Sequence, residues 1–127
     1  MLFHKGRGYV FLLQYHIVWC TKYRHKALVG EIEIRLKELL ALAKEHGFEI
    51  MSRETMPDHV HLLLDCRPQH YIPDLLKTLK SVTARTLLKE FPALKTKFWG
   101  KHVWSPSYFV VSVSDVSREV VTVYIES

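Results

Sequence analysis

The stretch FEIMSRETMPDHVHLLLDC, residues 48–66, predicts the central feature of the fold. Its first part, residues 48–54, alternates between apolar and polar side chains, which is typical of a half-exposed β-strand. Its last part, residues 59–66, is an apolar run that predicts a second strand. A short turn with a proline, TMPD, separates the two. We therefore expect an antiparallel hairpin of neighbouring strands.

One helix and one strand are predicted on each side of this hairpin. Upstream, residues 9–19 (YVFLLQYHIVW) are rich in aromatic and β-branched residues, which favours a strand. Residues 31–45 then carry apolar side chains at helical spacing, and Gly47 is well placed to end that helix in a left-handed conformation. Downstream, residues 72–91 repeat the helical spacing before Pro92, and residues 108–113 predict a last strand.

The resulting order of elements is β-α-β-β-α-β, which is typical of the ferredoxin-like, or split βαβ, arrangement. We therefore expect an α+β fold whose antiparallel sheet carries two helices on one face and leaves the other face open. No repeat, low-complexity tract or linker rich in proline, glycine or serine interrupts the sequence. The sequence thus predicts a single domain over residues 1–127.

The last residues, 114–127 (SDVSREVVTVYIES), allow two interpretations. Their β-branched residues favour a strand. Ser114 and Asp115 would suit the start of a helix, on which three of the valines would share one face. Propensity alone favours the helix only slightly, so both interpretations stay open at this point.

Composition and charge narrow the class of protein. Hydrophobic residues make up 48% and charged residues 24% of the chain, which is a composition that folds. No apolar run approaches the length of a membrane span and no signal peptide is visible, so we expect a cytoplasmic protein with no membrane partner and with Cys20 and Cys66 as reduced thiols. A net charge of +5 fits a polyanionic partner, nucleic acid before membrane surface, as well as it fits a mildly basic soluble protein.

Two histidines in the second strand of the hairpin are candidate metal ligands. His59 and His61 are two residues apart, so on a strand they point to the same face, while Val60, Leu62 and Leu64 point to the helices. Two imidazoles suit Zn, Mn, Fe, Ni or Cu, and with an oxygen ligand they can hold Mg or Mn for phosphate chemistry. The pattern alone is explained equally by polar residues on a half-exposed strand.

A tyrosine near the end of the chain is a candidate nucleophile that such a metal would assist. The hydroxyl of Tyr124 has an ordinary pKa near 10 and is a poor nucleophile at neutral pH. A divalent metal that polarises a phosphodiester lowers the nucleophilicity that the attack on phosphorus requires. Metal and tyrosine together therefore suit covalent DNA strand cleavage. Tyr124 would alternatively be a packing residue, and spacing does not exclude the other tyrosines, which are Tyr9, Tyr15, Tyr23, Tyr71 and Tyr108.

Cationic side chains are candidate phosphate contacts, because lysine and arginine bind the backbone of nucleic acids. Lys22 and Arg24 lie in a basic loop, TKYRHK, and Lys77, Lys80 and Arg85 lie on the second predicted helix. Each of them fits a solvated surface equally well. Trp99, Trp104 and Tyr108 would either stack on unpaired bases or, as is more common, pack a core or an interface.

Several segments taken together resemble a known family. They are YHIVWCTKYRHKALVGE, MPDHVHLLLD, LKSVTARTLLKEFP, FWGKHVWSPSYFV and VYIES. In this order they are similar to the small single-tyrosine transposases (TnpA) of bacterial and archaeal insertion sequences. These belong to the HUH class, which is named for the motif His–hydrophobic–His. The resemblance runs from Gly6 to Ser127, which is essentially the whole chain.

The resemblance implies a reaction and its residues. Such enzymes excise and insert a transposon as single-stranded DNA: the tyrosine attacks the scissile phosphate, forms a 5′-phosphotyrosine link and frees a 3′-OH, and no ATP is used. The nucleophile maps to Tyr124 on a C-terminal helix, which favours the helix for residues 114–127. The metal is Mg²⁺ or Mn²⁺, and its two histidine ligands map to His59 and His61.

The resemblance also implies partners. The ends of the element fold into imperfect DNA hairpins that the protein recognises, and the family forms homodimers in which the C-terminal helix can act in trans. The family's third metal ligand is a glutamine one helical turn after the tyrosine, a position that would fall beyond Ser127. A degenerate, non-catalytic protein that binds single-stranded DNA or RNA hairpins is the alternative function, since the ferredoxin-like arrangement is shared with RNA-binding domains.

Overall fold

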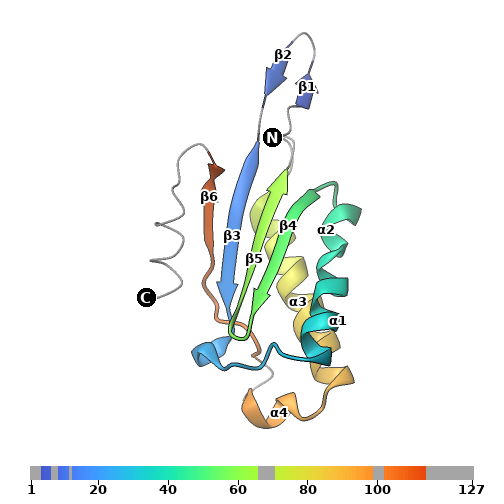
Figure 1. Cartoon of the computed structure of the whole chain (residues 1–127), viewed down its shortest axis with the longest axis vertical. Coiled ribbons are helices and arrows are strands. Elements are labelled where there is room, and N and C mark those ends of the chain that lie inside the picture. Colours follow the sequence, from blue (N-terminus) through green and yellow to red (C-terminus); the bar gives the residue numbers. More distant parts are fainter. Residues whose placement is uncertain (1–3, 7–8, 12, 66–70, 99–101, 114–127) are drawn as a thin grey trace.

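A computed structural model describes residues 4–6, 9–11, 13–65, 71–98 and 102–113. Its main sheet has four antiparallel strands in the order β4-β5-β3-β6, which are Glu49–Met56, His59–Asp65, Gln14–Cys20 and Phe109–Ser112. The helices α1 (Glu31–Leu40), α2 (Leu42–Glu45) and α3 (Ile72–Glu90) cover one face of this sheet, and a short α4 (Leu94–Lys97) follows α3 (Figure 1). This arrangement confirms the predicted ferredoxin-like α+β fold.

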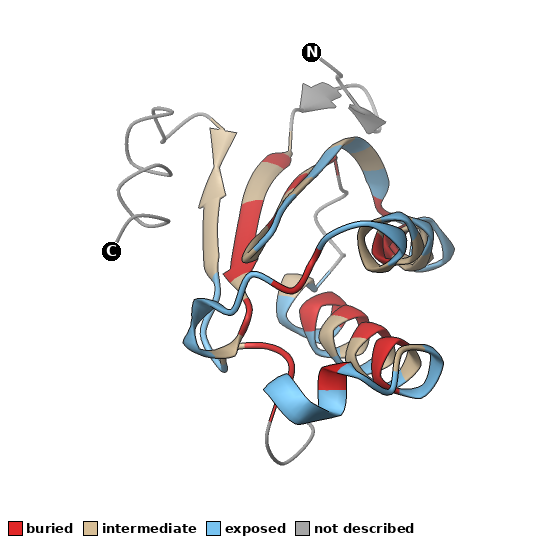
Figure 2. Ribbon diagram, turned by 60° about the horizontal axis from the view of Figure 1, so that its bottom comes forward, coloured by how far each residue is buried: buried red, intermediate tan, exposed pale blue. Residues whose placement is uncertain are grey.

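The core lies between the sheet and the helices. Along β5, Val60, Leu62 and Leu64 are fully buried, and Ile17 and Trp19 of β3 lie beside them. The helices contribute leucines at helical spacing, which are Leu36 and Leu40 of α1 and Leu75, Leu76, Leu79 and Leu87 of α3. Figure 2 shows that both long helices are buried on one side and exposed on the other, as an amphipathic pattern requires.

The first predicted strand, residues 9–19, is divided in the structure. Its beginning, β2 (Tyr9–Phe11), pairs with β1 (His4–Gly6) in a separate two-stranded sheet, and β3 begins at Gln14. The division follows from pairing: Gln14 lies opposite Asp65, the last residue of β5, so residues before Gln14 have no partner in that strand. A run of apolar residues does not reveal where its partner strand ends, which is why the sequence predicted one strand.

The helix predicted over residues 31–45 is interrupted once. Ala41 separates α1 from α2, and its backbone N–H donates to the carbonyls of Glu38 and Leu39. Gly47 ends the helical segment as predicted, with a φ of 87° and an N–H that donates to the carbonyl of Lys44 at 3.0 Å. A left-handed glycine is the usual way to satisfy the last carbonyls of a helix. The chain therefore turns sharply into β4.

Several sequence predictions fall outside the described residues. They concern the C-terminal helix with Tyr124, the thiol of Cys66, and Trp99. The last strand, predicted over residues 108–113, is confirmed as β6. Within the part of the chain that the structure describes, no helix is long and apolar enough to cross a membrane.

Candidate metal and nucleic-acid site

Strand β5 presents its two histidines on the face of the sheet that the helices do not cover. Val60 and Leu62 point into the core and are fully buried, whereas the side chains of His59 and His61 are 12% and 25% exposed. The two-residue period of the strand explains this division. Both imidazoles are thus partly shielded from water but remain accessible from the same side, as the sequence predicted.

His59 is oriented by the residue that precedes it. Its Nδ1 lies 2.8 Å from Oδ1 of Asp58. Burial of Asp58 opposes its charge, but the hydrogen bond with His59 and the positive charge of Arg24 together hold the pKa of the carboxyl below its ordinary value. An ionised carboxylate only accepts, so Nδ1 of His59 must be the protonated nitrogen. The lone pair for a ligand is therefore on Nε2.

The basic loop after β3 supports Asp58 from the other side. The Nε of Arg24 donates to Oδ2 of Asp58 at 3.1 Å. The loop is fastened to the turn of the hairpin, because the N–H of Thr21 donates to the carbonyl of Asp58 and the N–H of Leu28 donates to that of Pro57. The loop contains a 3₁₀ turn, η1 (Lys22–Arg24). Arg24, the last residue of this turn, has a positive φ of 55°. A strained conformation at a non-glycine residue needs support, and the pairing with Asp58 provides some of it.

His61 contacts a third histidine that sequence reasoning missed. Nδ1 of His16, on β3, lies 2.8 Å from Nε2 of His61, and the ring centroids are 5.0 Å apart. Val18 is the residue directly opposite His61, so His16 is its diagonal neighbour on the same face. Burial lowers the pKa of His16 and favours its neutral form, which has one N–H to donate and one lone pair to accept. The other nitrogen of His61, Nδ1, lies 3.9 Å from Oε2 of Glu54.

The same face carries further candidate ligands, but they do not form a complete site. Cys20 lies opposite His59 in the register, and burial raises the pKa of its thiol, so it remains protonated at neutral pH. Glu54 lies opposite His61 from the other neighbouring strand. Among the residues that the structure describes, no group of three or more histidines, cysteines and acidic residues is arranged to hold a metal ion. A metal at His59 and His61 would need a ligand from elsewhere.

The predicted cationic contacts lie in two separate places. Lys22 and Arg24 are in the loop beside the histidines, where Arg24 is already paired with Asp58. The other three, Lys77, Lys80 and Arg85, are on α3, which covers the opposite face of the sheet (Figure 1). The structure therefore does not gather the five predicted contacts into one surface.

Two of the aromatic candidates differ in their surroundings. Trp104 is 7% exposed, packs edge-on against Trp19, and donates from Nε1 to the hydroxyl of Thr83 at 2.9 Å. This is a core contact, so packing explains Trp104 better than base stacking. Tyr108 is 41% exposed, so burial in the core does not explain it as it explains Trp104.

Comparisons with known proteins agree on one family. The family model described as "Transposase IS200 like" matches residues 9–127. The ISDra2 transposase TnpA of Deinococcus radiodurans is 50% identical over 97% of this chain and 89% of its own length. A crystal structure of a candidate transposase from the same species superposes with a TM-score of 0.86 at 49% identity, over 97% of this chain and 95% of the other.

A more distant structure shares the fold alone. It is a REP-associated tyrosine transposase bound to a REP hairpin, and it superposes with a TM-score of 0.61 at 11% identity, over 97% of this chain and 68% of the other. The overlap extends over nearly all of this chain despite the low identity.

Proposed function

The chain belongs to the family of IS200-like transposases, and from this premise we propose that it cleaves and rejoins single-stranded DNA at the ends of an insertion sequence through a covalent tyrosine intermediate. The observation that carries the proposal is the pair of imidazoles, His59 and His61, side by side on the uncovered face of the sheet. Within this proposal one domain over residues 1–127 performs both DNA binding and chemistry.

Tyr124 is the nucleophile of the proposed reaction. The Oη of Tyr124 attacks the scissile phosphorus, a Tyr–O–P bond forms, and the P–O3′ bond breaks. The phenol gives up its proton, and the departing O3′ oxygen gains one and becomes the free 3′-OH. Rejoining is the reverse step, in which a 3′-OH attacks the phosphotyrosine and Tyr124 leaves. Because the phosphodiester bond energy is kept in the intermediate, no nucleotide cofactor is needed.

His59 and His61 are the residues that would hold a divalent metal, Mg²⁺ or Mn²⁺. The donor set fits such an ion, since Asp58 fixes the proton of His59 on Nδ1 and directs the Nε2 lone pair outward. When bound, the ion would withdraw charge from the phosphate and stabilise the charge that develops during attack. His16 already engages Nε2 of His61, so ligation through that nitrogen requires the His16 contact to open.

The proposed partners are DNA hairpins at the ends of the element and a second copy of the chain. The neighbour solved with a REP hairpin shows that this fold can carry hairpin binding in another protein. The likeness of residues 9–127 to the family supports a homodimer in which the segment with Tyr124 serves the site of either copy.

A covalent trapping experiment tests the proposed function. The protein is incubated with labelled single-stranded ends of the element, with Mg²⁺ or Mn²⁺ or with EDTA, and then denatured and separated on a gel. We expect a labelled protein–DNA adduct that survives denaturation and depends on the metal. Binding of the same DNA without any adduct would instead support the alternative, a degenerate protein that binds hairpins without cutting them.

Removing the carboxylate of Asp58 should weaken metal binding without removing a ligand. In the Asp58→Ala variant the proton of His59 is no longer fixed on Nδ1, and the ring can rotate. Partners of this kind typically account for about 10- to 100-fold in metal affinity. Isothermal titration with Mn²⁺ measures the change, and Asp74→Ala, an exposed aspartate at the start of α3, is the matched control. Equal Mn²⁺ affinities for Asp58→Ala and the unmodified protein would show that Asp58 does not orient the ligand.

A further inference from the structure

The segment that follows β3 holds Asp58 by its backbone and by its side chain. We call residues 21–24 the 21–24 segment. The N–H of the fully buried Thr21 donates to the carbonyl of Asp58 at 2.9 Å, and the N–H of Lys22 donates to the carbonyl of Val103 at 2.8 Å. The side chain of Arg24 then reaches the carboxylate of Asp58. The guanidinium of Arg24 is therefore carried by backbone that is fastened on two sides.

The carboxylate of Asp58 has a different partner on each of its two oxygens. Oδ1 lies 2.8 Å from Nδ1 of His59, and Oδ2 accepts from Nε of Arg24 at 3.1 Å. The side chain of Asp58 is only 16% exposed, so little water competes for these oxygens. A carboxylate held through one oxygen can still turn about its Cβ–Cγ bond, because that torsion is soft. The bond to Arg24 removes this freedom and thereby fixes the oxygen that His59 meets.

The backbone of the 21–24 segment adopts a costly conformation to make this contact. Tyr23 and Arg24 have positive φ values of 56° and 55°, in a region that residues other than glycine rarely occupy. Such strain persists only where surrounding contacts determine it, and it gathers at functional sites. Burial of the Tyr23 ring does not explain the conformation, since that residue is 82% exposed. The contact that accompanies the strain is the one between Arg24 and Asp58.

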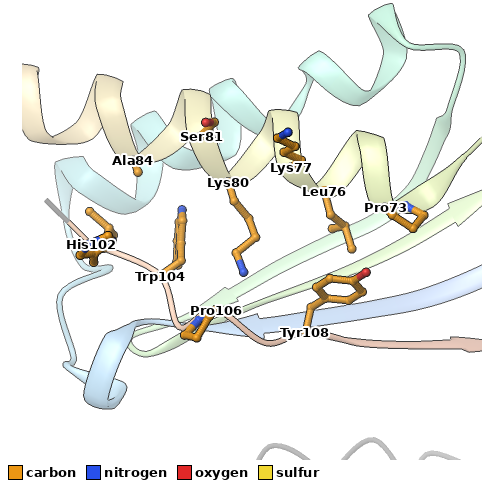
Figure 3. Close-up of a pocket in the computed structure, with 11 residues that line it drawn as sticks. Pro73, Leu76, Lys77, Lys80, Ser81, Ala84, His102, Trp104, Pro106 and Tyr108 are labelled. Carbon is orange, nitrogen blue, oxygen red and sulfur yellow. The ribbon is translucent and has the colours of Figure 1, made fainter.

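The cations of α3 are directed elsewhere. Figure 3 shows Lys80 extending from α3 toward the segment that carries Pro106 and Tyr108. Its ammonium donates to the carbonyl of Ser105 at 2.7 Å and lies 5.9 Å from the centre of the Tyr108 ring. Arg24 is thus the predicted phosphate contact that meets the support of His59.

The charge of Arg24 gives its role a sign that can be measured. A guanidinium beside a metal site repels a divalent cation, so a mere neighbouring charge would weaken metal binding. A guanidinium that orients a ligand through a carboxylate has the opposite effect, because partners of ligating histidines raise metal affinity. Lys22, on the same turn, has its ammonium 5.6 Å from the centre of the Tyr23 ring and provides the comparison.

We propose that Arg24 is a positioning residue of the metal centre. Through Asp58 it holds the imidazole of His59 in the orientation in which Nε2 meets the ion. The inference rests on the proposed function, because it takes His59 and His61 as the metal ligands. It gives Arg24 a role in metal binding in place of the phosphate contact that the charge pattern predicts.

Isothermal titration of the DNA-free protein with Mn²⁺ tests the role of Arg24. Arg24→Gly is the best variant, because glycine adopts a φ of 55° without strain and the turn keeps its course. Mn²⁺ affinity should fall by roughly threefold to tenfold, which is less than for Asp58→Ala, since the bond between Asp58 and His59 remains. Lys22→Ala removes a cation from the same turn and should bind Mn²⁺ equally well or better. Tyr23→Gly relaxes the other strained residue and should leave the affinity unchanged.

The same substitution in the Asp58→Ala protein separates positioning from a general effect on the fold. Without the carboxylate, Arg24 has no route to His59 and only its repulsion of the ion remains. Arg24→Gly should therefore leave the Mn²⁺ affinity of Asp58→Ala unchanged or raise it. An affinity of the single variant Arg24→Gly that equals or exceeds that of the unmodified protein would overturn the proposal. An equal loss in the Asp58→Ala background would overturn it as well.

Binding of fluorescein-labelled dT12 in EDTA, followed by fluorescence anisotropy, completes the test. Weaker dT12 binding by Arg24→Gly with unchanged Mn²⁺ affinity would make Arg24 a phosphate contact and refute the positioning role. The covalent adduct distinguishes this failure from failure of the proposed function. If the unmodified protein forms the adduct and Arg24→Gly keeps full Mn²⁺ affinity, the positioning role alone is refuted. If no adduct forms but Mn²⁺ binding depends on Arg24, only the proposed chemistry is refuted.

Discussion

Replacing Tyr124 with phenylalanine is expected to abolish the covalent protein–DNA adduct completely. The variant lacks the only atom of that side chain that can form a bond to phosphorus, so no residual fraction of the reaction can pass through it. Hairpin binding should remain nearly unchanged, because loss of one hydroxyl leaves the sheet, the histidines and the cationic surfaces as they are. Denaturing gels measure the adduct, and a gel shift in EDTA measures the binding.

The other tyrosines provide the controls for this experiment. Tyr71→Phe and Tyr108→Phe remove hydroxyls from two exposed tyrosines that have no place in the proposed chemistry, so their adducts should form normally. A covalent adduct in Tyr124→Phe would show that another residue is the nucleophile. In that event, mass spectrometry of the linked peptide would identify it.

The hairpin and the direction of its histidines could be predicted because burial constrains them. Once Val60, Leu62 and Leu64 fill the core, the two-residue period of a strand sends His59 and His61 to the other face, and a slip by one residue would bury the histidines instead. The predicted order of elements follows in the same way from helices that must cover one side of the sheet. These features depend on local patterns, which a single sequence contains.

The support around the histidines could not be predicted, because it depends on register and loop docking. A strand pattern places His16 on a face of β3 but does not reveal that it meets His61 diagonally, across 45 residues of chain. Asp58 was interpreted only as a turn residue, and its role depends on Arg24, which is 34 residues away. A fixed distance between such residues is a property of the folded sheet and its loops.

The pattern of charged and aromatic residues predicted the roles of individual side chains less well than the strand pattern predicted which face they occupy. The position of Lys80 on a helix face predicts a phosphate contact. In the structure its ammonium donates to the carbonyl of Ser105, in the segment that leads into β6. Trp104 is part of the core through its contact with Trp19. A cation or a tryptophan has the same letter in the sequence whether it faces solvent or a neighbouring segment, so burial decides its role.

The second large effect is expected from the histidine pair. His59→Ala or His61→Ala removes a proposed metal ligand outright, so Mn²⁺ affinity should fall by more than the roughly 100-fold that loss of an orienting partner costs. Without the ion, the weakly nucleophilic phenol meets an unpolarised phosphate, and the metal-dependent adduct should disappear. Isothermal titration measures the first effect and the denaturing gel the second.

A third histidine distinguishes ligation from packing on this face. His16→Ala removes the hydrogen bond to Nε2 of His61, so Mn²⁺ should bind at least as well as in the unmodified protein. His46→Ala, at an exposed position after α2, should leave binding and adduct unchanged. If His61→Ala bound Mn²⁺ with unchanged affinity, His61 would not be a ligand. If His16→Ala lost Mn²⁺ binding as completely as His61→Ala, the ion would be held by His16 and His61 on two neighbouring strands. It would then not be held by the two histidines of β5.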